Sequence, residues 1–164
     1  MMDKVVVFKN SHFSDLRGDL WSIWDESVFE PKLKFNLDKV AKSKKNVLRG
    51  LHGDNKSWKL ITCLYGEFLL CTVDYRQNSE SFLKNEFHLL TSENKKSVLV
   101  PPMFLNGHLV LSDECVFHYK WSFDGKYPDI DEQFSVRWDD PILNIKWPIE
   151  KPILSERDKN CNFI

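Results

Sequence analysis

Residues 59–74 read KLITCLYGEFLLCTVD, which is two apolar runs (Lys59–Tyr65 and Glu67–Asp74) separated by Gly66. Both runs are short and carry the β-branched and other apolar residues that are typical of strands. The sequence Tyr65-Gly66-Glu67 has the composition of a tight turn, because glycine adopts backbone angles that other residues avoid. The stretch therefore predicts two consecutive β-strands joined by a turn.

The same pattern continues on both sides of this stretch. Helical periodicity is weak, apart from a helical turn at Ser155–Lys159, and no long helix separates the apolar runs. Parallel sheets need such crossover helices, so we predict an all-β sandwich or jelly roll. The lysine-rich stretch Lys39–Lys45 is expected to be a solvated loop. The other expected strands are Lys4–Phe8, Asp19–Asp25, Leu33–Leu37, Val47–Leu51, Ser81–Leu90, Ser97–Val100, His108–Leu111, Cys115–Trp121 and Leu143–Ile145.

Composition and charge narrow the class of protein. The chain has 164 residues, a hydrophobic fraction of 42% and a formal net charge of −1. We expect residues 1–164 to form one domain. Nucleic-acid binding requires a basic face, so a nucleic-acid partner is not expected. Four cysteines without Cys-x-x-Cys spacing indicate a reducing compartment. Met1–Asn10 contains an apolar run too short for a signal peptide or a membrane span. We therefore expect a cytoplasmic protein that does not bind membranes.

Polar side chains inside the apolar runs indicate where a ligand would enter such a barrel. Arg49 and His52 lie three residues apart in an otherwise apolar run. Burying them is costly unless they have partners. Lys59 begins the next run, where a solvated lysine at a strand edge is the ordinary interpretation. Asp74 ends the run after that, where capping of the strand or a pair with Arg76 would account for it.

Two further groups complete the set of candidate residues. Strand alternation places Tyr119 on one face with Phe117 and Trp121, where a core tyrosine is the ordinary interpretation. Asn106 and His108 share a face if they lie in a strand. The candidates together offer an imidazole base, a phenol acid, an ammonium group and a carboxylate. This inventory suits proton abstraction from a carbon beside a carbonyl group.

Short motifs spread over nearly the whole chain resemble the dTDP-4-dehydrorhamnose 3,5-epimerase family, in family order and with similar gaps. The Leu-Arg-Gly-Leu-His string is fairly specific, and the ordered set is a strong signal. The matching residues are Asp15-Leu16-Arg17-Gly18, Val47-Leu48-Arg49-Gly50-Leu51-His52, Lys59-Leu60-Ile61, Gly66 to Val73-Asp74-Tyr75-Arg76, Val100-Pro101, Leu111-Ser112, Tyr119-Lys120, Trp138-Asp139-Asp140-Pro141, Trp147-Pro148 and Leu154-Ser155-Glu156-Arg157-Asp158.

The resemblance implies a cupin-like jelly-roll homodimer that exchanges an N-terminal segment and needs neither a metal ion nor another cofactor. It implies that His52 is the general base, with Asp158 as its carboxylate partner. Tyr119 would be the general acid on the opposite face of the sugar. Lys59 would face the C4 oxygen of a 4-keto sugar, and Asp74 would support this network from behind.

The resemblance also suggests residues that bind the substrate. Arg49 resembles a phosphate contact, and Arg17 would reach the nucleotide of the neighbouring subunit. The family usually has a histidine where Asn106 stands and an aromatic residue where His108 stands. Either His108 supplies the imidazole from two positions along, or the pocket is shaped for another sugar. The substrate-packing tyrosine of the family has its nearest counterpart in Tyr127.

The proton-transfer residues are thus kept, while residues expected to contact the sugar and the nucleotide differ. This split suggests the same chemistry on a different substrate, a GDP-linked 4-keto heptose of capsular polysaccharide synthesis. The alternative substrate is the dTDP-linked sugar of the family itself. Whether C3, C5 or both are inverted stays open.

Two other classes of protein compete with an epimerase. A metal-dependent cupin would use His52 and His108 as ligands, but Gly53-Asp54 follows His52 where a His-x-His pair is usual. Metal analysis of the purified protein would distinguish a metal-dependent cupin from a metal-independent epimerase. A non-catalytic sugar-nucleotide-binding module would not need an acid and a base on opposite faces of the sugar. Incorporation of deuterium from heavy water into a 4-keto sugar would distinguish an epimerase from a binding module, which does not catalyse this exchange.

Overall fold

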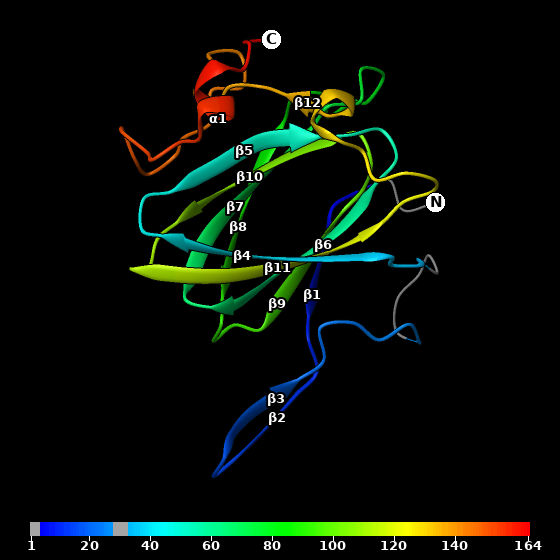
Figure 1. Ribbon diagram of the computed structural model, residues 1–164, viewed down its shortest axis with the longest axis vertical. Coiled ribbons are helices and arrows are strands. Elements are labelled where there is room, and N and C mark those ends of the chain that lie inside the picture. The colour runs from blue at the N-terminus through cyan, green and yellow to red at the C-terminus, as the bar shows by residue number, and fades with distance from the viewer. Residues whose placement is uncertain (1–3, 28–32) are drawn as a thin grey trace.

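The computed structural model describes residues 4–27 and 33–164, which form two five-stranded antiparallel sheets packed face to face (Figure 1). This arrangement confirms the predicted all-β jelly roll. The first sheet has the order β1 (Val6–Lys9), β9 (Lys96–Val100), β6 (Trp58–Tyr65), β11 (Glu114–Ser122) and β4 (Leu37–Lys44). The second has the order β12 (Phe134–Ser135), β5 (Leu48–Gly53), β10 (Phe104–Val110), β7 (Glu67–Asp74) and β8 (Asn85–Thr91). A hairpin of β2 (His12–Asp15) and β3 (Gly18–Trp21), a 3-10 turn at Ile130–Glu132 and the helix α1 (Glu156–Asn160) complete the described elements.

The turn at Gly66 joins strands of different sheets. Both predicted strands are present as β6 and β7, but β6 belongs to the first sheet and β7 to the second. Gly66 has a φ of +78°, and a Cβ atom there would lie 2.2 Å from the carbonyl oxygen of Glu114. Only glycine therefore fits where the chain passes from one sheet to the other.

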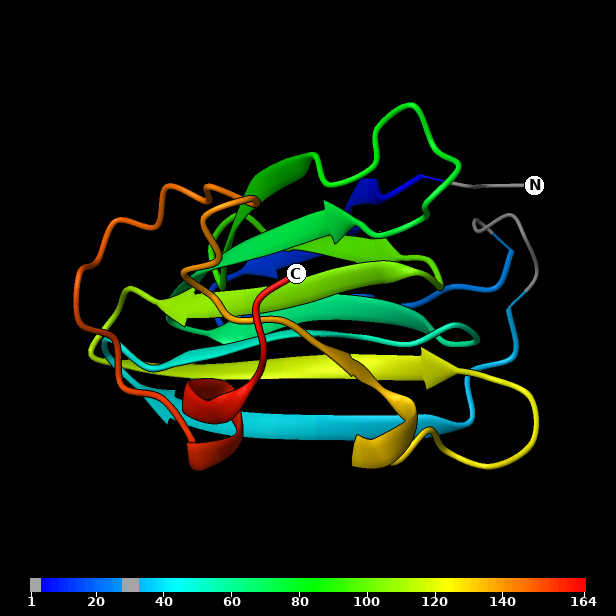
Figure 2. The ribbon, with the colours of Figure 1, turned by 90° about the horizontal axis from the view of Figure 1, so that it is seen from above.

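Three apolar layers bury the central strands on both faces. The inner layer lies between the two sheets and includes Phe68 and Phe117. A second layer covers the outer face of β5, β7 and β10 and includes Trp147 from the segment after β12. Figure 2 shows the course of that segment. A third layer covers the outer face of β6 and β9, where Trp24 and Phe35 of the N-terminal segment pack. The sheets are thus held by packing from both ends of the chain.

The lysine-rich stretch Lys39–Lys45 is not the solvated loop that we predicted. Most of it lies in β4, at the edge of the first sheet. Lys42 and Lys44 point outward and are exposed, whereas Lys39 and Ala41 alternate with them and are half-buried. Charged side chains on the outer face of an edge strand discourage pairing with other chains, which explains the composition.

The prediction of a strand at Leu143–Ile145 is wrong. Residues 141–144 form a turn, because the carboxylate of Asp140 accepts hydrogen bonds from the backbone N–H groups of Ile142 (2.8 Å) and Leu143 (3.1 Å). A side-chain acceptor of this kind replaces the partner that a strand would need. The helical turn predicted at Ser155–Lys159 is confirmed as α1.

A bulge in β5 turns two polar side chains toward the same side of the sheet. Arg49 and His52 are three residues apart, so regular alternation would place them on opposite faces. Along β10, however, their partners His108 and Asn106 are only two residues apart, because the register shifts between them. Gly50, with a φ of +120°, occupies this irregularity. The extra residue in β5 brings both side chains to the side of the sheet that faces the pocket.

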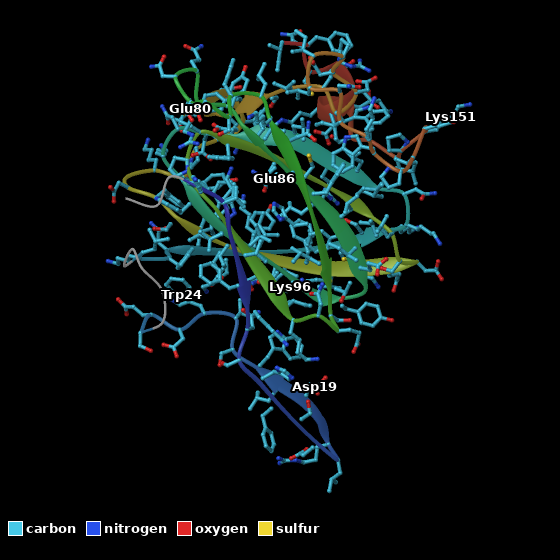
Figure 3. The ribbon with its side chains drawn as sticks, turned by 180° about the vertical axis from the view of Figure 1, so that it is seen from behind. Asp19, Trp24, Glu80, Glu86, Lys96 and Lys151 are labelled. Carbon is cyan, nitrogen blue, oxygen red and sulfur yellow. The ribbon has the colours of Figure 1, made fainter. Side chains whose placement is uncertain are left out.

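The β2–β3 hairpin projects from the body of the molecule (Figure 1), and Asp19 marks its position among the side chains in Figure 3. Every residue from 11 to 20 is exposed, including the apolar Phe13, Leu16 and Leu20. Within residues 4–27 and 33–164, no helix has the length and apolar character needed to cross a membrane.

Replacing Gly50 by alanine is expected to destabilise the protein strongly. A Cβ atom at this position would lie 2.5 Å from Cα of Gly107 and 2.7 Å from the carbonyl oxygen of Asn106. Strain and overpacking together should lower the free energy of unfolding by at least about 3 kcal/mol. Gly125→Ala is the matched control, because Gly125 also has a positive φ but no atom within 4 Å of the added Cβ. It should cost about 1–2 kcal/mol in the same urea titration. Equal losses for the two variants would contradict the close contact.

Candidate active site

A pocket of about 430 Å³ lies on the inner side of the two sheets and gathers most of the predicted site residues. Strands β4, β5, β6, β10 and β11 contribute to its wall, together with α1 and the segment after β11. The predicted residues that line it are Arg49, His52, Lys59, Asn106, His108, Tyr119, Tyr127 and Asp158.

A carboxylate from the C-terminal segment holds His52. Its Nε2 atom lies 2.7 Å from Oδ1 of Asp158. Asp158 is buried in α1, and the hydroxyl of Ser155, the N-cap of that helix, donates a hydrogen bond to Oδ2 (2.8 Å). Burial by itself raises the pKa of Asp158, but the His52 ring and the Ser155 hydroxyl hold it below its usual value. The anion orients the imidazole and stabilises the imidazolium that forms when the ring takes a proton.

Lys59 lies in β6 and is buried, with 4% of its surface exposed, rather than at a solvated strand edge. Its Nζ atom is 3.0 Å from Oδ2 of Asp54 and 4.4 Å from the ring centroid of Trp121. Burial lowers the pKa of Lys59, and the carboxylate of Asp54 opposes that shift. The amine of Lys59 is thus fixed in the wall of the pocket, with a carboxylate beside it that favours its charged form.

Tyr119 projects from β11 between two aromatic neighbours. Its ring stacks on Phe117, with centroids 5.1 Å apart, and lies 5.6 Å from Trp121. All three side chains line the pocket, while His118 and Lys120 bond to Asp38 outside it, as alternation predicted. Burial, reinforced by Tyr127, raises the pKa of Tyr119. The phenol therefore keeps its proton near neutral pH and can donate it.

Asn106 and His108 share a face of β10, as predicted, but only one of them is bonded. Asn106 donates a hydrogen bond from its side chain to the carbonyl oxygen of His52 (2.9 Å). His108 is buried against the ring of Phe117, with centroids 4.1 Å apart. Its Nε2 atom has no hydrogen-bond partner within the described part of the chain. Burial, together with the nearby charge of Arg49, lowers the pKa of His108 to about 3, so the ring is neutral.

Cationic side chains outnumber carboxylates around the pocket. Arg49 lies at its exposed side and donates a hydrogen bond to Ser43 (3.2 Å). The Nζ atom of Lys39 is 2.5 Å from the hydroxyl of Tyr127. Arg157 is held by a hydrogen bond to Ser135 (2.7 Å). With Lys59, four cations face the two carboxylates of Asp129 and Asp158. Such an excess suits an anionic ligand.

Sequence reasoning missed three of these residues. Lys39 was assigned to a loop, and Arg157 was noted only as part of a motif. Asp54 was considered only as a poor metal ligand. The position of Asp54, two residues after His52, was the signal that could have identified it. Its ion pair with Lys59, however, depends on how the connection between β5 and β6 folds.

Two predicted residues lie away from the pocket. Asp74 lines a second cavity, where its carboxylate binds Arg76 (2.6 Å) and accepts hydrogen bonds from Ser79 and Ser81. The prediction that Asp74 supports the Lys59 network is therefore wrong, because the loop after β7 occupies its oxygens. Arg17 lies near the tip of the β2–β3 hairpin, paired with Asp15 (2.6 Å). Its predicted contact with a neighbouring subunit stays a prediction.

Among residues 4–27 and 33–164, no group of three or more His, Cys, Asp and Glu side chains is placed to hold a metal ion. What the pocket does contain is an imidazole–carboxylate pair, a phenol and a buried ammonium group. These groups can remove a proton from a carbon, stabilise the resulting anion and return a proton.

Comparison with known proteins fits this chemistry. The profile of the family described as dTDP-4-dehydrorhamnose 3,5-epimerase matches residues 1–164. The chain belongs to this family. The dTDP-4-dehydrorhamnose 3,5-epimerase of Shigella flexneri is 37% identical over 163 residues, which cover 95% of this chain and 88% of that protein. The chain is therefore an epimerase, an isomerase as the sequence predicted.

Solved structures of the epimerase family share the fold. The dTDP-6-deoxy-D-glucose-3,5-epimerase of Legionella pneumophila, in complex with dTDP-4-keto-L-rhamnose, has a TM-score of 0.90 and 30% identity, covering 99% of this chain and 88% of that chain. A 3'-monoepimerase from Streptomyces bikiniensis, in complex with dTDP-quinovose, has a TM-score of 0.90 and 27% identity, covering 97% and 83%. Proteins that share this fold thus include both a 3,5-epimerase and a 3'-monoepimerase.

The neutral state of His108 in this epimerase should make folding sensitive to mild acid. In the unfolded chain a histidine has a pKa near 6.5, whereas His108 in the folded protein titrates near 3. As the pH falls below about 6.5, only the unfolded chain binds this proton, so stability is lost. The loss should reach about 2 kcal/mol between pH 7 and pH 5.

Urea titrations of the wild type and of His108→Phe at these two pH values test this expectation. The phenylalanine variant keeps the apolar contacts but cannot bind the proton, so its stability should fall less by about 2 kcal/mol. Carboxylates contribute equally to both proteins and cancel in the comparison. Identical losses would show that His108 takes up a proton in the folded state.

Proposed function

We propose that the chain inverts C3, C5 or both carbons of a dTDP-linked 4-keto-6-deoxy sugar. The convergence of His52 with Asp158, Lys59 and Tyr119 on one pocket carries this proposal. An imidazole and a phenol in the same pocket provide the base and the acid that inversion of a carbon requires. The buried ammonium group provides the charge that the intermediate requires.

Proton removal comes first. The C4 ketone acidifies the hydrogens on C3 and C5, because the electron pair left on the carbon delocalises to O4 as an enolate. Neutral His52 takes the hydrogen as a proton, and Asp158 stabilises the imidazolium. The ammonium group of Lys59 faces O4 and stabilises its negative charge, which is worth about 3–4 kcal/mol for one well-placed group in comparable oxyanion sites.

Proton return completes the inversion. The hydroxyl of Tyr119 gives its proton to the opposite face of the same carbon, and the enolate electron pair forms the new C–H bond. The phenolate of Tyr119 and the imidazolium of His52 then exchange protons with solvent, which restores both groups. The raised pKa of Tyr119 supports its role, since the phenol is protonated at the start of each cycle.

The names of the relatives support the dTDP-linked substrate, and the cations around the pocket support a nucleoside diphosphate in general. The relatives in Shigella flexneri and Legionella pneumophila are named for dTDP-linked sugars, and the Legionella structure contains one. The excess of cations around the pocket suits a diphosphate, and Arg49 at its exposed side is our candidate phosphate contact. Tyr127, which lies 5.2 Å from Trp121, is our candidate for packing against the substrate. This choice replaces the GDP-linked heptose that the sequence departures suggested.

We also propose that the chain works as a homodimer that exchanges its N-terminal hairpin. The β2–β3 hairpin projects from the body and exposes Phe13, Leu16 and Leu20 (Figure 1). Exposed apolar side chains on a projecting element are typical of a surface that another chain covers. Arg17, whose side chain is 80% exposed, would then reach the nucleotide in the partner's pocket.

Replacing Tyr119 by phenylalanine should separate proton removal from inversion. His52 still removes the proton and can return deuterium to the same face in heavy water, so deuterium should enter the 4-keto sugar. The inverted product should fall by at least about a hundredfold, because the opposite face has lost its donor. His52→Asn should abolish both deuterium entry and inversion. Mass spectrometry and NMR of dTDP-4-keto-6-deoxyglucose incubated with each variant measure these outcomes.

Tyr65→Phe is the matched control, because Tyr65 is an exposed tyrosine at the end of β6 and lies outside the pocket wall. The Tyr65→Phe variant should introduce deuterium into the 4-keto sugar and form the inverted product at the wild-type rate. Full inversion by Tyr119→Phe would rule out the phenol as the proton donor. Deuterium entry catalysed by His52→Asn at the wild-type rate would rule out the imidazole as the base.

Substrate preference is the second test of the proposal. The kcat/KM for dTDP-4-keto-6-deoxyglucose should exceed the kcat/KM for a GDP-linked 4-keto heptose by at least about tenfold. A tenfold preference corresponds to about 1.4 kcal/mol of transition-state binding. Both reactions are followed by deuterium entry at C3 and C5, which also shows which carbons react. Preference for the GDP-linked heptose would overturn the substrate assignment while leaving the chemistry intact.

A further inference from the structure

The ion pair behind the pocket wall joins two buried charges. Lys59 has 4% of its surface exposed and Asp54 has 1%. Their Nζ and Oδ2 atoms are 3.0 Å apart. Lys59 lines the pocket, whereas Asp54 is not among the described residues that do so. Asp54 therefore contacts the reacting region only through the lysine.

The loop between β5 and β6 fixes the carboxylate of Asp54. Its Oδ1 atom accepts hydrogen bonds from the backbone N–H groups of Ser57 (2.6 Å) and Lys56 (3.1 Å). The second oxygen is left to face Lys59. One oxygen thus anchors the side chain and the other aims at the ammonium group. This division gives the pair a defined direction that a mobile surface carboxylate lacks.

Burial and two neighbouring cations oppose the charge of Lys59. Burial disfavours the ammonium form, and the positive charges of Arg157 from α1 and Lys39 from β4 act the same way. The ring of Trp121 from β11, 4.4 Å from Nζ, offers a weaker attraction. Of the groups that act most strongly on Lys59, Asp54 is the carboxylate, and it favours the charged form.

We propose that Asp54 is a positioning residue of the epimerase, which keeps the ammonium group of Lys59 charged and aimed at the C4 oxygen of the substrate. This inference rests on the proposed function, in which Lys59 stabilises the enolate. An unpaired lysine buried beside two other cations would lose its proton. A neutral amine could not offset the charge that develops on O4, so the rate of proton removal depends on a residue that never touches the sugar.

The effect should fall on the chemical step rather than on binding. The ketone oxygen of the bound substrate is neutral, and its negative charge develops only as the proton leaves. An interaction that strengthens in the transition state changes kcat more than KM.

Asp54→Asn is the decisive variant. The amide keeps an oxygen for the N–H groups of Lys56 and Ser57 but replaces the anion facing Lys59 with a neutral NH2 group. We expect kcat for deuterium entry into dTDP-4-keto-6-deoxyglucose to fall at least about tenfold, with KM changed by less than about threefold. The alkaline limb of the kcat profile should also move to lower pH, because the ammonium group loses its proton more easily. A merely structural role would lower activity at every pH alike.

Asp113→Asn is the matched control. It makes the same change of charge in an exposed carboxylate that pairs with Lys45 on the surface (3.7 Å). Its kcat and its pH profile should equal those of the wild type.

Lys59→Met and the double variant with Asp54→Asn separate the two proposals. If Asp54 acts through Lys59, the double variant should be no slower than Lys59→Met alone. Wild-type activity of Lys59→Met would overturn the role of Lys59 in the proposed function. An inactive Lys59→Met combined with an Asp54→Asn enzyme of unchanged pH profile would overturn this inference alone.

A measurement on the wild type decides the matter if Asp54→Asn does not fold, which far-UV circular dichroism would reveal. The ¹³Cε resonance of Lys59 in ¹³C-lysine-labelled protein, assigned by its loss in Lys59→Met, reports the charge of the side chain. We expect the ammonium form throughout the pH range of full activity. A neutral Lys59 within that range would overturn the inference.

Discussion

The close contact between Gly50 of β5 and Gly107 of β10 is the constraint on which the site depends. A Cβ atom on Gly50 would lie 2.5 Å from Cα of Gly107, so the two backbones meet without side chains between them. The extra residue that this contact accommodates in β5 directs Arg49 and His52 to one side. Without it, one of the two would point into the outer apolar layer, where neither a phosphate nor a sugar could reach it.

Local periodicity predicted the parts of the site that regular strands carry. Alternation along β11 was enough to place Tyr119 on one face with Phe117 and Trp121. The same argument placed Asn106 and His108 together on the condition that both lie in a strand, and β10 meets that condition. A period of two residues holds wherever a strand stays regular, whereas the bulge interrupts it in β5. The all-β jelly roll was predictable for the same reason, since its short apolar runs and turns are local signals.

Features that depend on a distant partner were not predictable in this way. A run of lysines is compatible both with a solvated loop and with the outer face of an edge strand. The pairing of β4 with β11 determines that these residues form a strand. Asp54 and Asp74 are both carboxylates that follow apolar runs, and the sequence suggested the wrong one as support for Lys59. The loops after β5 and β7 decide which carboxylate has an oxygen atom available for Lys59. Backbone N–H groups bind one oxygen of Asp54 and leave the other available. Arg76 and two serines bind the carboxylate of Asp74.

The contact between His52 and Asp158 also has a consequence for how the protein matures. It joins a strand from the first third of the chain to a helix near residue 160, so it closes a loop of about a hundred residues at a cost in chain entropy. A folding intermediate with both sheets in place but α1 undocked would hold its imidazole without a counter-ion. In the proposed mechanism activity therefore requires the docked C-terminal segment, and the appearance of activity during refolding would report when that segment docks.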